Sequence, residues 1–225
     1  MLTVHHLDHS RSHRVVWLLE ELGVDYALER YERDPTTLRA PLSLKAVHRL
    51  GRAPTITDDG RTFAESGAVL EYLVERYDDG RLAPPRGTPE RERYSYFMHY
   101  AEGSAMLPLI LRLIFGQMPR QPMPALARPV VRALAKNVID TFVRPQIEEH
   151  LDHMEASLAS TPWFAGEAFT AADIQMSFPI EAAAAGGSLG ASRRHLSDYL
   201  QRIRERPSYR RALAKGGPYD LTKLG

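Results

Sequence analysis

The sequence contains no cysteine in its 225 residues. Disulfide bonds, thiolate metal sites and nucleophilic or redox-active cysteines are therefore excluded. If this protein performs sulfur chemistry, the sulfur atom must arrive with a substrate.

The sequence also lacks a charge excess and a long apolar run. Its formal net charge is +1, so no global field draws it to nucleic acid or to an acidic membrane, and we expect neither partner. The longest apolar stretch, Ala105 to Phe115, contains Pro108 and Arg112 and is far shorter than the ~18 residues of a membrane span. The opening Met-Leu-Thr-Val-His-His has no signal-peptide character, which favours a cytoplasmic protein.

The first fifty residues predict a strand, a helix and a second strand. Residues 2–7 read as a strand, and apolar residues between Arg14 and Leu22 recur with a helical period. Gly23 favours the end of that helix, and residues 26–31 read as the next strand. This order is typical of a parallel βαβ unit.

A hairpin and another helix are expected next. A strand begins after Pro54, and Asp59-Gly60 is a strong two-residue turn into a return strand over 61–64. Ser66 is the expected N-cap of a helix that extends to about Tyr77. The residues that follow are rich in proline and glycine and have the composition of a linker.

The rest of the chain predicts helices and no good strand. Thr170 and Asp173, flanked by Phe169 and Ile174, form the signature of a helix start. The other helical segments expected there are 90–115, 130–159, 196–205 and 209–214, with a proline-rich loop or broken helix over 117–129.

Three motifs resemble the cytosolic glutathione transferase family. They are Asp8-His9-Ser10-Arg11-Ser12-His13-Arg14 with the helix after it, His48-Arg49-Leu50-Gly51-Arg52-Ala53-Pro54, and Ala64-Glu65-Ser66-Gly67-Ala68. The opening loop is most similar to that of a bacterial and fungal subgroup. The resemblance implies an α/β thioredoxin-like domain over 1–80, a linker over 81–89, and an all-helical bundle over 90–225 that forms an electrophile pocket.

The resemblance implies a set of glutathione-binding residues. Glu65 and Ser66 would hold the γ-glutamyl end at a helix N-terminus, where free N–H groups favour a carboxylate; otherwise they are a surface acid and a helix cap. Ala53, before a cis Pro54, would pair its backbone with the cysteinyl part. Arg52 and Lys45 would hold the glycyl carboxylate, unless they are ordinary solvated charges.

The group that activates the thiol would lie in the loop before the first helix. In the family it is a Tyr, a Ser or a Cys, and here no Tyr precedes Tyr26. The resemblance therefore favours Ser10 as the hydrogen-bond donor to the glutathione sulfur, with Arg11 helping to stabilise the thiolate. Ser12 is the alternative donor, although both serines could instead cap the helix. A backbone N–H could also contribute.

Further residues have two readings. By resemblance Glu102 would reach the γ-glutamyl ammonium bound in a second subunit; the other reading is a helix-surface carboxylate. Met106, Leu107, Ile110 and Phe115 would line the electrophile pocket, although apolar residues at helical spacing are often plain core. His9 and His13, and His150 and His153, have the spacing of metal ligands but no convincing third ligand, so we expect no metal.

The function implied is attack by the thiol of bound glutathione on an apolar electrophile. Glutathione would be a co-substrate, no cofactor would be permanently bound, and the protein would be a homodimer. One alternative is glutathione-dependent reduction of peroxides or disulfides, since the same thiolate serves. Another is a non-catalytic glutathione-binding or scaffold module.

Overall fold

The computed structural model describes residues 1–34, 37 and 39–224. Its first part is a four-stranded sheet in the order β2-β1-β3-β4. The strands are β1 (Thr3–Leu7), β2 (Ala27–Tyr31), β3 (Thr55–Asp58) and β4 (Arg61–Ala64). β1 and β2 are parallel and are joined by α1 (His13–Leu22), whereas β3 and β4 pair antiparallel. The predicted βαβ unit and hairpin are confirmed.

The hairpin turn has the backbone that its sequence predicts. Asp59 and Gly60 have φ angles of 47° and 77°. Positive φ at both central residues defines the two-residue turn whose twist matches that of the strands. Asp58 and Arg61 therefore pair directly on either side of it.

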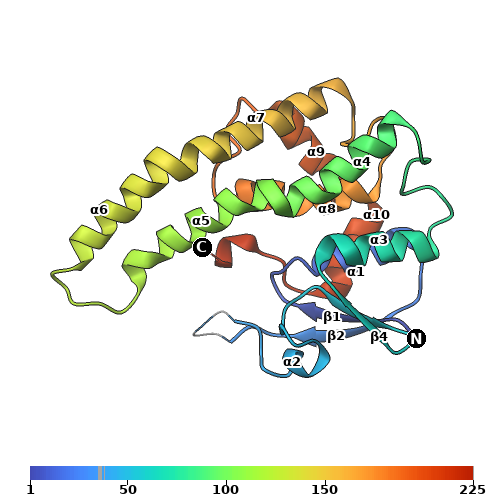
Figure 1. Ribbon diagram of the computed structural model, residues 1–225, viewed down its shortest axis with the longest axis horizontal. Helices are drawn as coiled ribbons and strands as arrows, with labels where there is room; N and C mark the ends of the chain where they lie inside the picture. Colours follow the sequence, from blue (N-terminus) through green and yellow to red (C-terminus); the bar gives the residue numbers. More distant parts are fainter. Residues whose placement is uncertain (35–36, 38, 225) are drawn as a thin grey trace.

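Helices cover both faces of the sheet (Figure 1). α1 and α3 (Ser66–Tyr77) lie on one face, and α2 (Leu44–Val47) lies on the other. Side chains alternate along β1, so that Val4 enters the main core while Leu7 packs with Tyr31 and Leu44. α2 was missing from the sequence prediction because four residues are too few to show a helical period.

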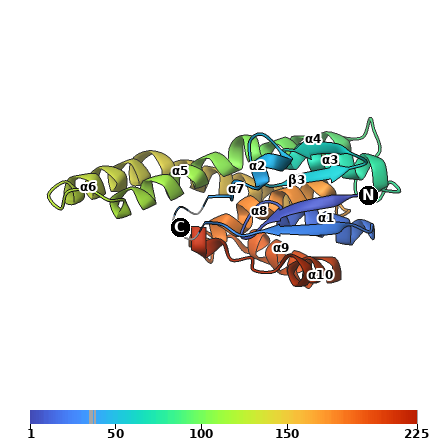
Figure 2. The ribbon, with the colours of Figure 1, turned by 90° about the horizontal axis from the view of Figure 1, so that it is seen from below.

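The second part is helical, and no strand follows β4 in the described chain. α4 (Pro89–Tyr100), a π-helical turn η1 (Ala101–Ala105) and α5 (Met106–Gln117) form one continuous rod. After the 3₁₀ turn η2 (Met118–Arg120), the chain returns through α6 (Arg128–Val138), a second π-helical turn η3 (Ile139–Val143) and α7 (Arg144–Ser160). The two long predicted helices are confirmed, and the α5–α6 hairpin extends beyond the rest of the molecule (Figures 1 and 2).

α8 (Ala171–Ala185) runs through the middle of the helical part and is buried on nearly every side. It begins with the predicted capping box of Thr170 and Asp173. The Asp173 carboxylate also accepts the backbone N–H of Phe164 at 2.9 Å. The loop that contains Phe164 is thereby attached to the N-terminus of α8.

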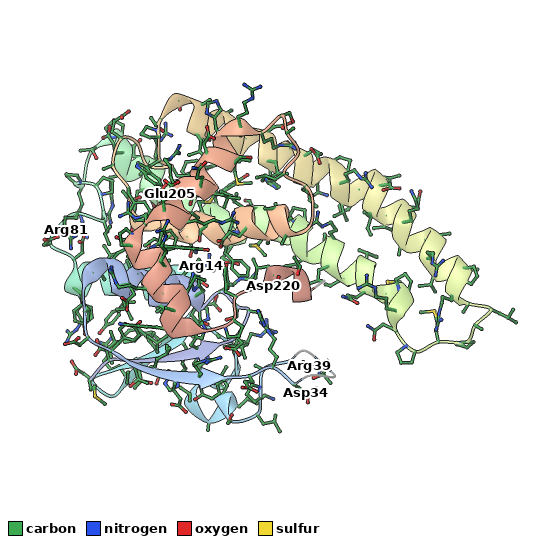
Figure 3. All side chains as sticks on the ribbon, turned by 180° about the vertical axis from the view of Figure 1, so that it is seen from behind. Arg14, Asp34, Arg39, Arg81, Glu205 and Asp220 are labelled. Carbon is green, nitrogen blue, oxygen red and sulfur yellow. The ribbon has the colours of Figure 1, made fainter. Side chains whose placement is uncertain are left out.

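The C-terminal helices bring the chain back to its beginning. α9 (Arg194–Glu205) leads to α10 (Pro207–Gly216), which packs along α1. The 3₁₀ turn η4 (Leu221–Leu224) follows, and Figure 3 shows Asp220 beside it, between the sheet and α5. None of the described helices is both long and apolar enough to cross a bilayer.

Candidate active site

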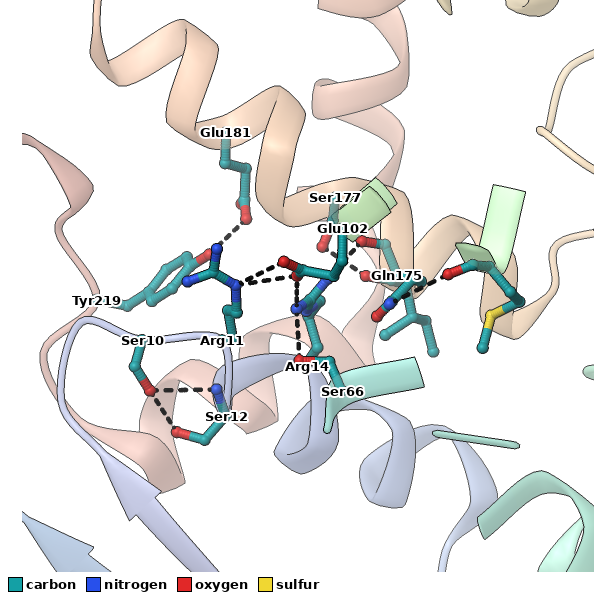
Figure 4. A network of polar contacts seen from close by, with 12 residues as sticks. Ser10, Arg11, Ser12, Arg14, Ser66, Glu102, Gln175, Ser177, Glu181 and Tyr219 are labelled. Atoms are coloured by element: carbon teal, nitrogen blue, oxygen red, sulfur yellow. Dashed lines mark hydrogen bonds and ion pairs between the residues drawn. The ribbon is translucent and has the colours of Figure 1, made fainter. Parts of the chain in front are cut away.

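A fully buried arginine connects the sheet to the helical part (Figure 4). Arg14 on α1 donates through Nη1 to the backbone carbonyl of Gln175 on α8, at 2.8 Å. Its Nη2 donates to the Ser66 hydroxyl at 2.8 Å and to the Glu102 carboxylate at 2.5 Å. Arg14 therefore holds α1, α8, η1 and the N-terminus of α3 together.

The Glu102 carboxylate is shared by two arginines. The Arg11 Nε donates to both of its oxygens at 3.0 Å, and both guanidinium groups lie over the Phe178 ring, at 4.9 and 5.2 Å from its centroid. Burial opposes ionisation of Glu102, but Arg14 and Arg11 outweigh it and lower the pKa of this carboxyl. Two cations around one carboxylate leave one positive charge in excess.

Glu102 belongs to a cluster of charged side chains rather than to an open helix surface. A bare helix-surface carboxylate is wrong, because both oxygens are engaged by side chains of the same chain. Its expected contact with the γ-glutamyl ammonium bound in a second subunit stays a prediction. The carboxylate fixes Arg11, and it does so from a π-helical turn, a local distortion that often marks functional sites.

The two serines of the opening loop face one another (Figure 4). Ser12 is fully buried, and its hydroxyl accepts the Leu7 N–H at 3.1 Å and lies 2.9 Å from the Nδ1 of His6. It makes no side-chain cap bond to α1, so the capping interpretation of Ser12 is wrong. Ser10 is also buried, and its hydroxyl accepts the Ser12 N–H at 3.2 Å and lies 2.7 Å from the Ser12 hydroxyl.

Two buried histidines lie beneath this loop. Burial lowers the pKa of His6 to about 4 and that of His13 to about 3, so both rings are neutral at pH 7. A neutral His6 can present Nδ1 as an acceptor for the proton of the Ser12 hydroxyl. In that tautomer Ser10 must donate to Ser12 across their 2.7 Å contact. In the other tautomer His6 donates from Nδ1 to Ser12 and Ser12 donates to Ser10, so the Ser10 proton is available to another partner.

The C-terminal segment is fastened over the loop. The Tyr219 ring stacks on His13 at 4.2 Å between centroids, and the Tyr219 hydroxyl donates to the buried Glu181 at 2.7 Å. The backbone N–H of Asp220 donates to the Nδ1 of His9 at 2.9 Å. Residues 219–222 thereby reach the opening loop, a long-range contact that sequence reasoning did not predict.

The predicted glutathione-binding residues lie at the start of α3 and along the edge of the sheet that is formed by the strand ends, where β3 begins and β4 ends. The Ala53–Pro54 peptide bond is cis, as the resemblance implied. Glu65 is exposed with φ of 74° and, among the described residues, its carboxylate has no partner. Ser66 is the first residue of α3 rather than its N-cap, a correction explained by its hydroxyl, which accepts from Arg14.

The two predicted cations come from α2 and from the loop before β3. Lys45 and Arg52 are both exposed, and neither forms an ion pair with any residue that the structure describes. The stem of Lys45 passes close over Gly51, where an added Cβ would lie 2.5 Å from the Lys45 Cγ. Gly51, with φ of 55°, therefore keeps room for the lysine between α2 and Pro54.

An apolar pocket of about 360 Å³ opens beside Arg11. Of the four residues expected in an electrophile pocket, Met106 and Ile110 line it. Leu107 and Phe115 do not: Leu107 points outward with 54% of its surface exposed, and Phe115 packs against the core. The sequence analysis missed the remaining apolar wall, which comes from Leu109, Leu113, Phe178, Ala182, Ala185 and Leu221.

The missed part of the wall has two origins. Leu109 and Leu113 repeat at the helical spacing of Met106 and Ile110, a signal that could have identified them. Phe178, Ala182 and Leu221 come from α8 and the C-terminal segment, which only tertiary packing brings to α5.

The histidine pairs do not form a metal centre in the described structure. No group of three His, Cys, Asp or Glu side chains lies close enough there to hold an ion. His150 contacts the Tyr100 hydroxyl at 2.7 Å, and His153 contacts the Tyr96 hydroxyl at 3.2 Å.

Comparison with known proteins decides the family. The N-terminal domain model of glutathione S-transferases matches residues 1–75, and the C-terminal domain model matches residues 135–207. Glutathione S-transferase 3 of Schizosaccharomyces pombe is 35% identical over 222 residues, covering 99% of this chain and 90% of the relative. The chain belongs to the glutathione S-transferase family. It is therefore a transferase.

Solved structures of the family have the same fold. A glutathione S-transferase from Actinobacillus pleuropneumoniae is 32% identical, with a TM-score of 0.83 over 100% of this chain and 97% of that one. A sphingomonad glutathione S-transferase, solved with glutathione, is 24% identical with a TM-score of 0.72, covering 96% and 98%. The thioredoxin-like sheet followed by a helical bundle is thus the transferase fold.

We expect Glu102→Gln to destabilise the protein. Removing the carboxylate leaves Arg14 buried and Arg11 half-buried without a counter-ion, which should lower the free energy of unfolding by about 2–3 kcal/mol. Urea unfolding measures this. Glu149→Gln, an exposed acid on α7, is the matched control and should change the free energy by less than about 0.5 kcal/mol. Equal effects of the two substitutions would contradict the central role of Glu102.

Proposed function

We propose that this chain binds glutathione along the sheet edge and the start of α3, and conjugates its sulfur to an apolar electrophile. One observation carries the proposal. The apolar pocket opens beside Arg11, which directly follows the loop serine nearest the expected thiol. A thiolate bound at that loop would face an electrophile held in the pocket.

The start of α3 suits the γ-glutamyl end of glutathione. Its free backbone N–H groups and the buried Arg14 beneath them favour a carboxylate. The Ser66 oxygen accepts from Arg14, so the Ser66 proton remains to donate to that carboxylate. The exposed Glu65 is positioned beside it to pair with the ammonium group.

The sheet edge suits the other end of the tripeptide. Ala53 precedes the cis Pro54 and would offer its backbone N–H and C=O to the cysteinyl residue as one strand-like rung. Arg52 and Lys45, which lie exposed nearby, would hold the glycyl carboxylate. These contacts fix the sulfur close to the opening loop.

We propose that Ser10 and Arg11 act together on the sulfur. When His6 carries its proton on Nδ1, it donates to Ser12 and Ser12 donates to Ser10, so the Ser10 hydroxyl can turn its own proton to a thiolate. Arg11 binds Glu102 through Nε, and the net positive charge around Glu102 favours the ionised sulfur. Ser12 keeps the loop in place.

The reaction needs no covalent enzyme intermediate. The thiolate forms a bond to the electrophilic carbon, and a leaving group departs with its electron pair or a proton adds to the product. Glutathione is the co-substrate. A peroxide or disulfide could accept the same attack, so a hydroperoxide assay beside an aryl-halide assay separates conjugation from reduction.

Glu65→Gln should weaken glutathione binding by at least tenfold. The substitution keeps the shape of the side chain but removes the charge that pairs with the ammonium, worth about 1.5–3 kcal/mol. Calorimetric titration with glutathione measures the Kd. Glu71→Gln, an exposed acid on the same helix, should leave the Kd unchanged. A normal Kd in the first variant would disprove this placement of glutathione.

Ser10→Ala should lower turnover with an aryl halide by about ten- to a hundredfold and leave the glutathione Kd nearly unchanged, since a hydrogen bond to the ionised sulfur is charge-assisted. The thiolate absorbance of bound glutathione at neutral pH should fall, and Arg11→Met should lower it as well. Ser12→Ala should instead reduce stability, because the Leu7 N–H loses its acceptor. If only Arg11→Met changes the absorbance, the serine assignment is refuted.

We also propose that the protein is a homodimer of the cytoplasm, as its membership of the glutathione S-transferase family suggests. Light scattering should give twice the 25.4 kDa protomer mass at micromolar concentration. A twofold dimer would present the same patch from each subunit. A mass of one protomer at that concentration would refute it.

A further inference from the structure

The apolar pocket is lined by cations and by no acid. Three arginines contribute to its described wall, Arg11, Arg112 and Arg120, and no aspartate or glutamate does. Arg11 is already balanced in part by Glu102. The other two lie on α5 and in the turn that follows it, away from that carboxylate along the chain.

Arg112 is half-buried and lacks a counter-ion among the described residues. Its only side-chain hydrogen bond there goes from Nη1 to the neutral Ser188 hydroxyl. Burial lowers the pKa of this guanidinium, and no nearby carboxylate opposes the shift. A charge removed from water beside apolar walls is unfavourable unless it is paired.

The acids near the pocket are committed to other partners. Glu148 and Asp152 both bind Arg193, at 2.5 and 2.8 Å, and Glu148 and Arg193 line the adjoining hollow. Glu181 accepts the hydroxyls of Tyr209 and Tyr219. Asp220 accepts the backbone N–H and the hydroxyl of Thr222. No carboxylate of these surroundings pairs with Arg112.

Gly186, at the end of α8, leaves the space in which the Arg112 guanidinium lies. A Cβ added there would be 1.5 Å from Nη2 and 2.4 Å from Cζ. Any side chain at 186 would therefore push the guanidinium out of its position. The φ of Gly186 is −82°, so alanine fits the backbone and the conflict is with Arg112 alone.

We propose that the pocket selects electrophiles that carry an anionic group, such as a carboxylate or sulfonate, beside an apolar body, and that Arg112 binds this group. The apolar wall takes the body while the guanidinium gains the counter-ion that the protein does not supply. This inference rests on the proposed conjugation for its meaning but is tested first by binding, which needs no turnover.

The binding test uses two fluorescent ligands with one ring system. 8-Anilinonaphthalene-1-sulfonate carries a sulfonate, and N-phenyl-1-naphthylamine is the same skeleton without it. We expect the wild-type protein to bind the sulfonate at least tenfold more tightly than the neutral ligand. Equal affinities would overturn the inference.

Three variants assign the selectivity to Arg112. Arg112→Gln should weaken sulfonate binding about tenfold or more, as expected when a charged partner is lost, and leave the neutral ligand unaffected. Gly186→Ala keeps the charge but displaces it and should reduce sulfonate binding as well. Arg132→Gln, an exposed arginine of α6 outside the pocket, should change neither. Equal loss of both ligands in Arg112→Gln would mean a merely structural role and would overturn the inference.

A kinetic test separates this inference from the conjugation proposal. 4-Chloro-3,5-dinitrobenzoate and its methyl ester differ at the reacting ring only through the charged group, and each rate is divided by its uncatalysed rate. The acid should have the higher corrected kcat/KM, and Arg112→Gln should abolish the preference while ester turnover persists. Conjugation of the ester in preference to the acid would refute anion selection but not the conjugation proposal. If neither compound reacts, conjugation fails, and the binding ratios still decide the pocket.

Discussion

The buried Arg14 guanidinium is the interaction on which this structure depends. It lies on α1, within the thioredoxin-like part, but its partners are Ser66, Glu102 and the Gln175 carbonyl. A cation with no exposed surface can be accommodated only if such partners surround it. The requirement therefore sets the position of α3, η1 and α8 relative to α1. The pocket beside Arg11 and the expected glutathione edge take their geometry from the same contacts.

The carboxylate that balances Arg14 also prepares the chemistry. Glu102 binds Arg11 through both oxygens, so the Arg11 side chain, next to Ser10, is held in one conformation. One carboxylate between two guanidinium groups does not cancel their charge, and the remainder lies next to the place where the thiolate is expected. Structural support and stabilisation of an anion thus come from one cluster, which makes it hard to alter one without the other.

Much of the fold could be predicted because its signals are local. The Asp59-Gly60 turn, the helix that stops at Gly23 and the capping box at Thr170 each depend on residues a few positions apart. The site was harder to predict from the sequence, since its contacts join segments that are distant along the chain. Ser66 was interpreted as a helix cap because no residue near it in the sequence indicates that its hydroxyl accepts a hydrogen bond from Arg14. The role of Glu102 and the approach of residues 219–222 to His9 depend on tertiary packing for the same reason.

The rod of α4, η1 and α5 explains why Arg11 and Arg112, two cations of the pocket, have different roles. Glu102, which fixes Arg11, and Arg112 are ten positions apart on this rod, a separation of about 15 Å along a helix. Apolar residues Met106, Leu109 and Ile110 lie between them and line the pocket. A molecule in contact with the thiolate at one end and Arg112 at the other must therefore be apolar in its middle.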